Sequence, residues 1–143
     1  MKSVMKSTNS STPQNSNLLV FTYTRADAIA DGVLLDVSPL AREAGFQIPV
    51  ALTVGLWATY GAPDKTPAGD QGTCWDILWM LRCAAFGILP AKLECHPHGE
   101  TLWFQLELTP HGKTQPELVL LKAISGGGDD GEPVLTILLP HED

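Results

Sequence analysis

The stretch AKLECHPHGETLWFQLEL, residues 91–108, decides the fold class, because two of its segments alternate apolar and polar residues around a short turn. In TLWFQLEL, Leu102, Phe104, Leu106 and Leu108 would share one face of a strand, and the residues between them the other. Such alternation is typical of strands with one buried face. The stretch therefore predicts a hairpin of two half-buried strands joined by HPHGE.

Two further apolar segments follow this hairpin. ELVLLKAI (residues 117–124) and VLTILLP (residues 134–140) are nearly continuous apolar runs. Runs of this kind indicate strands that are covered on both faces or that lie at the centre of a sheet. We therefore expect an antiparallel meander of four strands in the C-terminal half.

Between these runs, the glycine-rich stretch GGGDDGEP could suggest a ligand loop. A phosphate loop needs a helix after its glycines, and here Glu132, Pro133 and a strand follow. A calcium loop needs acidic residues at alternating positions, whereas Asp129 and Asp130 are adjacent. The stretch predicts a wide, acidic hairpin loop.

Upstream of the hairpin, TCWDILWMLRCAAFGIL (residues 73–89) is apolar on nearly all sides and predicts a central buried helix. Thr73 and Asp76 have the spacing of a capping box at its start. Trp75 and Trp79 are four residues apart and share a face, with Arg82 three residues further on. This group could recognise a flat ligand or an anion, although core packing with a snorkelling arginine is the commoner arrangement.

The N-terminal half predicts shorter elements. Thr24 and Asp27 form a capping-box variant before a helix that ends at Gly32, and VLLDVS predicts a short strand. In SPLAREAGF, Ser38 is expected to cap a second short helix that ends at Gly45. Two segments follow: residues 49–60, expected to form a mostly buried helix although their composition also fits a strand, and residues 61–72, an exposed loop.

These segments together predict an α+β fold, with N-terminal helices and a long buried helix packed on a C-terminal antiparallel sheet of about four strands. At 143 residues and 44% hydrophobic content, the chain has the size of one domain, assigned to residues 18–143. Residues 1–17 are rich in Ser, Thr and Asn without an apolar signal-peptide core, and we interpret them as a disordered tail. No stretch has the length of a membrane span, so a cytoplasmic location is expected.

The net charge of -7 argues against binding of duplex nucleic acid through its phosphates. Residues 91–143 hold 9 acidic and 3 basic residues, whereas residues 1–90 hold 7 and 6. The acidity of the C-terminal third is usual for a soluble surface, but it also suits a basic protein partner.

Motifs for catalysis or metal binding are weak. Cys74, Cys83 and Cys95 form no CxxC pair, which fits a reducing compartment. His96 and His98 could ligate a metal, but no second cluster completes a site, so neither a metal nor a cofactor is expected. No catalytic residue is identified.

Three segments resemble a family of small uncharacterised proteins encoded on bacterial plasmids and integrative conjugative elements. They are YTRADAIADGVLLDVSPLAREAGF, CWDILWMLRCAA and LVLLKAISGGGDDGEPVLTILLPHED, within residues 21–143. The resemblance implies a genomic setting and no reaction.

Our first hypothesis is a non-enzymatic accessory protein of a mobile element that binds a host or element-encoded protein and inhibits a defence system such as restriction or CRISPR. The expected contact residues are acidic: Asp129, Asp130, Glu132, Glu142 and Asp143.

Two alternatives remain open. One is a small-ligand-binding domain or small enzyme with a pocket between helices and sheet, near Arg25, Trp75, Trp79 and Arg82. The other is a homodimeric structural subunit.

Overall fold

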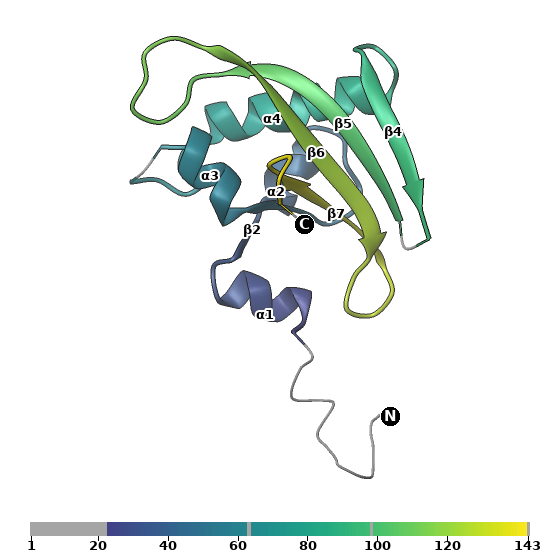
Figure 1. Cartoon of the computed structure of the whole chain (residues 1–143). Coiled ribbons are helices and arrows are strands. Elements are labelled where there is room, and N and C mark those ends of the chain that lie inside the picture. The colour runs from purple at the N-terminus through teal and green to yellow at the C-terminus, as the bar shows by residue number, and fades with distance from the viewer. Residues whose placement is uncertain (1–22, 63, 98, 143) are drawn as a thin grey trace.

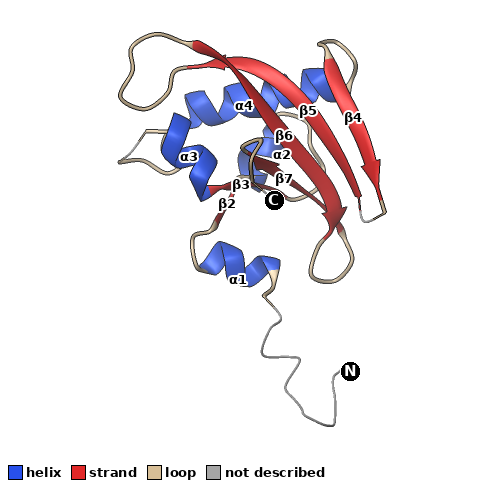
Figure 2. Cartoon of the chain, in the orientation of Figure 1, coloured by secondary structure: helices blue, strands red, loops and turns tan. Residues whose placement is uncertain are grey.

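A computed structural model describes residues 23–62, 64–97 and 99–142 of the chain (Figures 1 and 2). In chain order its elements are α1 (Arg25–Ala30), β2 (Leu34–Asp36), α2 (Ser38–Glu43), β3 (Val50–Thr53), α3 (Val54–Tyr60), α4 (Gln71–Ala85), β4 (Ala91–His96), β5 (Gly99–Leu108), β6 (Glu117–Gly127) and β7 (Pro133–Leu138). The strands form one sheet in the order β2-β3-β7-β6-β5-β4. The α+β class predicted from the sequence is confirmed. The expected N-terminal tail lies outside the described residues.

The antiparallel meander is also confirmed, because β4, β5, β6 and β7 pair in sequence with antiparallel neighbours. The sheet has six strands and not about four, since β3 adds to β7 in parallel and β2 adds to β3 in antiparallel orientation. The first half of the chain thus completes the sheet of the second half.

The core lies between one face of this sheet and the helices α2, α3 and α4 (Figure 2). From β5, β6 and β7 it receives Phe104, Leu121 and Ile137, each at most 1% exposed. From α4 it receives Ile77 and Leu78, both fully buried. We call this the inner face, and the opposite one the outer face.

The two apolar runs lie in β6 and β7, which occupy the centre of the sheet. The central position was one of the two alternatives expected from the sequence, and it is confirmed. The other alternative, a strand covered on both faces, is wrong for part of β6, because the side chains of Leu118 and Leu120 are 66% and 40% exposed. The residues of β5 that pair with them, Glu107 and Gln105, lie on the same outer face, and this part of the outer face is exposed.

The prediction of one helix over residues 49–60 is wrong for its first part. Val50–Thr53 is a fully buried strand between β2 and β7, and only Val54–Tyr60 is helical. The hydroxyl of Thr53 accepts a hydrogen bond of 3.2 Å from the backbone N–H of Leu56 and so caps α3. The apolar segment therefore changes from strand to helix at Thr53, whose side chain can cap the helix.

Helix capping follows the sequence at one of three places. The capping box of Thr24 and Asp27 is present in α1. Ser38 is the first residue of α2 and does not cap it, because its hydroxyl donates to Asp36 Oδ1 at 2.6 Å and accepts from the Val50 N–H at 3.0 Å. The capping box expected at Thr73 is absent, because α4 already begins at Gln71.

Candidate functional site

The acidic β6–β7 turn, expected to contact a partner, is joined to the first helix. Both carboxylate oxygens of Asp129 accept backbone hydrogen bonds from the start of α1: Oδ1 from Arg25 at 2.7 Å and Oδ2 from Ala26 at 3.0 Å. These two bonds hold the pKa of Asp129 below its ordinary value. The side chain therefore acts as a cap supplied from 103–104 positions further along the chain.

Two of the other expected contact residues, Glu142 and Glu132, also accept hydrogen bonds within the chain. Glu142 accepts from the Thr53 hydroxyl at 2.7 Å and from the Leu139 N–H at 2.8 Å, which fixes the end of the chain on the start of α3. Glu132 accepts from the Asp130 N–H within the turn. Asp143 lies outside the described residues.

Arg25 does not lie near the tryptophans. Its guanidinium donates to Thr136 Oγ1 at 2.7 Å and to the Leu135 carbonyl at 2.9 Å, on the outer face at β7. Burial lowers the pKa of Arg25. The four residues of the expected ligand pocket therefore line no common hollow, because α4 packs on the inner face.

The aromatic group on α4 is formed as the sequence indicated. The rings of Trp75 and Trp79 stack with centroids 5.7 Å apart and planes inclined by 15°. The Arg82 guanidinium lies 5.1 Å from the Trp79 ring and 4.9 Å from the Phe86 ring, which places the cation between two aromatic faces. Arg82 Nε is buried and has no hydrogen-bond partner among the described residues.

A hollow of about 400 Å3 lies between this stack and β5, and we call it the α4–β5 groove. Its walls are mainly apolar and aromatic, and two acidic residues are among those that line it. It is lined by Trp75, Asp76, Trp79, Met80, Leu106 and Glu107.

A second hollow, the inner cleft, opens between the C-terminal end of α4 and the β4–β5 hairpin and has a volume of about 330 Å3. Phe46, Leu81, Leu93 and Leu102 are among its apolar lining residues. It also lies between the helices and the sheet, but it contains none of the four pocket residues expected from the sequence, whereas the α4–β5 groove contains Trp75 and Trp79.

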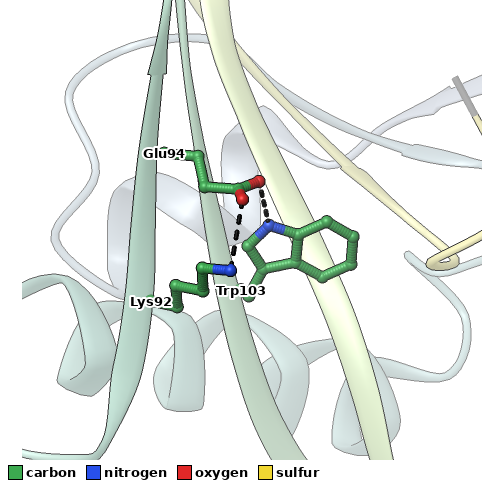
Figure 3. A network of polar contacts seen from close by, with 3 residues as sticks. All are labelled: Lys92, Glu94 and Trp103. Atoms are coloured by element: carbon green, nitrogen blue, oxygen red, sulfur yellow. Dashed lines mark hydrogen bonds and ion pairs between the residues drawn. The ribbon is translucent and has the colours of Figure 1, made fainter.

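The outer face has a polar cluster that sequence reasoning missed (Figure 3). Glu94 of β4 accepts from the Trp103 indole N–H at 2.8 Å and pairs with Lys92 Nζ at 3.3 Å. Lys122 of β6, only 8% exposed, places its Nζ 5.5 Å from the Trp103 ring. Only the register of β4, β5 and β6 brings these residues together, and single-strand alternation does not give that register.

The thiol of Cys74 lies fully buried in the core. Burial raises the pKa of the Cys74 thiol to about 12, so this thiol stays protonated at neutral pH. No group of three or more His, Cys, Asp or Glu residues that could hold a metal ion occurs among the described residues. None of the helices in the described part of the chain is long and apolar enough to cross a membrane.

Comparison with known proteins identifies a family. A family model described as a family of unknown function, DUF6573, matches residues 14–143. Searches of curated proteins and of solved structures returned no match.

Proposed function

We propose that this chain, which belongs to the family of unknown function DUF6573, is a non-enzymatic accessory protein that binds a protein partner through the α4–β5 groove. The observation that carries the proposal is the exposed aromatic surface formed by α4 and by Phe86 directly after it. Trp79 is 40% exposed and Phe86 is 65% exposed, although both stack on Arg82. Aromatic residues and arginine held in a fixed arrangement are enriched at protein interfaces.

The geometry favours this groove over the acidic turn. Both carboxylate oxygens of Asp129 and Oε1 of Glu142 already accept hydrogen bonds from within the chain. The α4–β5 groove combines apolar and aromatic walls with the acidic residues Asp76 and Glu107 at its border. It offers the apolar centre and polar rim of an interface.

For the biological setting, we propose a mobile genetic element and inhibition of a host defence system. The resemblance to proteins of plasmids and integrative conjugative elements supports the setting. The net charge of -7 supports a basic partner, because nucleic-acid-targeting defence proteins present positive surfaces.

The test is affinity capture from the bacterial host with three forms of the chain: wild type, Trp79→Gln and Leu118→Gln. We expect wild type and Leu118→Gln to retain the same protein, and Trp79→Gln to lose it. Leu118→Gln is the matched control because it removes an exposed apolar side chain from the outer face. Circular dichroism verifies that all three forms are folded.

Equal retention by Trp79→Gln and wild type would contradict the role of the groove. A parallel capture with Asp130→Lys tests the acidic turn, since this carboxylate accepts no hydrogen bond from the described residues, unlike that of Asp129. Loss of the partner in Asp130→Lys alone would move the binding surface to the turn.

A second candidate function, binding of a small apolar ligand, is favoured by the inner cleft. Its lining is mainly apolar, and Glu100 and Ser125 supply polar groups in its wall. The test is titration with the fluorescent probe 1-anilinonaphthalene-8-sulfonate, with Leu102→Gln as the cleft variant. Saturable binding to wild type that the variant loses supports a ligand site, and no saturable binding contradicts it.

A further inference from the structure

Strand β5 is longer than the strand beside it. The β4–β5 register pairs Ala91 with Phe104 at one end and His96 with Gly99 at the other, so that pairing to β4 stops at Phe104. Pairing to β6 continues to Leu108, which pairs with Glu117. Residues 105–108 therefore form a sheet edge with no strand beside it among the described residues, and α4 passes behind this part of β5 (Figure 1).

The other sheet edges have features that discourage strand addition. β4 is preceded by Pro90 and has Lys92 near its start, and proline and lysine are common protective residues at edges. β2 is only three residues long and contacts α1. The free part of β5 contains neither proline nor lysine, and Pro110 follows only after it ends.

The backbone groups at this edge face outward at alternate residues. Two residues join β4 and β5 between His96 and Gly99, and the residues that flank a two-residue hairpin turn form a hydrogen-bonded pair. Bonded pairs then recur at every second residue of β5. The alternation directs the backbone N–H and C=O of Gln105 and Glu107 to the free edge.

Hollows lie on both faces of the sheet at this edge. The α4–β5 groove includes Leu106, an inner-face residue. A hollow of about 440 Å3 on the other side includes Trp103, Gln105 and Leu120, which are outer-face residues by register, and is shared with Pro90 and with Ala91, Lys92 and Glu94 of β4. An added strand presents successive side chains to opposite faces, so its side chains would enter the two hollows alternately.

We propose that this edge binds an extended segment of a basic partner protein, which adds as a strand beside Gln105–Leu108 and places a Lys or Arg side chain in the α4–β5 groove. The chemistry follows from the groove and from the charge of the edge: the Trp75 ring and the acidic residue Asp76 line the groove and favour a cation, and Glu107 adds a negative charge on the outer face of the same edge. This inference rests on the proposed function and specifies the mode of binding.

The test begins with selection of decapeptides from a random display library on the full-length chain. The expected result is enrichment of peptides with β-branched or aromatic residues in alternation and a Lys or Arg on one face. The best peptide is then titrated into labelled protein and followed by NMR. We expect shifts at the backbone amides of residues 105–108 and at the Trp79 indole.

Two variants separate the backbone from the charge. Gln105→Pro removes an outward N–H and should weaken peptide binding roughly tenfold, since strand addition depends on main-chain bonds. Glu107→Lys reverses a negative charge of the free edge itself, on its outer face, and should weaken binding of a basic peptide by roughly the same factor. Val33→Gln, which changes an exposed apolar residue just before β2 at the opposite edge of the sheet, is the matched control and should bind as wild type does.

Failure to enrich any peptide, NMR shifts confined to other elements, or unchanged affinity in both variants would overturn the proposal. A dimer in light scattering that Gln105→Pro converts to a monomer would also overturn it, because the occupant would be a second copy. Partner capture that Trp79→Gln abolishes and Gln105→Pro and Glu107→Lys leave intact would refute strand addition while retaining the proposed function.

Discussion

The carboxylate of Asp129 accepts a 2.7 Å hydrogen bond from the backbone N–H of Arg25, which lies 104 positions earlier in the chain. The Arg25 side chain in turn donates to Thr136 and to the Leu135 carbonyl on β7. Two sets of hydrogen bonds thus hold α1 in place: its backbone N–H groups bind the acidic turn, and its Arg25 side chain binds β7. The glycine-rich stretch is a turn, as the sequence indicated, and it positions a cap for a helix.

Replacement of Asp129 by Ala should lower the thermal stability of the chain. Loss of the carboxylate leaves the first N–H groups of α1 without their acceptor. The control is Asp130→Ala, which removes the same charge from the neighbouring position of the turn. Thermal unfolding followed by circular dichroism should show a lower midpoint for Asp129→Ala than for Asp130→Ala, and equal midpoints would contradict the capping role.

The same carboxylate predicts a pH dependence of stability. The folded-state pKa of Asp129 lies below its ordinary value of 3.8, so the unfolded chain binds the proton more readily. The stabilisation is therefore fully present above pH 3.8 and is lost as the pH falls through the folded pKa. Denaturant unfolding of wild type and Asp129→Asn should give free energies that differ at neutral pH and converge in acid. A difference that persists at the lowest pH would contradict the prediction.

The sequence predicted the C-terminal half of the fold well, because alternation in β5 and apolar runs in β6 and β7 are local signals. It failed over residues 49–60, where four buried residues form a strand through pairing with β2 and β7. Those two strands flank β3 in the sheet, and β7 comes from the last part of the chain, far from β3 in sequence. A local pattern cannot reveal such pairing.

The candidate site was predictable only in part. The spacing of Trp75, Trp79 and Arg82 on one helix placed the stack correctly, because helical geometry is local. The groove beside it depends on where β4 ends relative to β5. That relationship is a matter of register, and neither strand specifies it alone.

Gly45 should be intolerant of a side chain. Its φ of 106° is one that residues with a Cβ rarely adopt, and an added Cβ would lie 2.7 Å from Arg82 Nε. Gly45→Ala should therefore destabilise the chain by about 1–2 kcal/mol from the backbone alone, plus the cost of moving Arg82. Urea unfolding measures the change.

Gly87→Ala is the matched control for this effect. Gly87 also has a positive φ, 76°, but a Cβ there would meet no atom within 4 Å. Its destabilisation should reflect the backbone alone, and Gly45→Ala should exceed it. If the two variants were equally stable, the packing of Arg82 against Gly45 would make no contribution.

The three cysteines should differ in reactivity in an order set by burial. Cys95 is exposed, Cys83 is partly buried, and Cys74 is fully buried with a pKa of about 12. Since alkylation requires an accessible thiolate, iodoacetamide at neutral pH should modify Cys95 first and Cys74 last. Mass spectrometry of timed samples gives the order, and urea should make all three react at similar rates. Early modification of Cys74 in the folded chain would show that α4 separates from the sheet, and would therefore contradict the packing on which the α4–β5 groove depends.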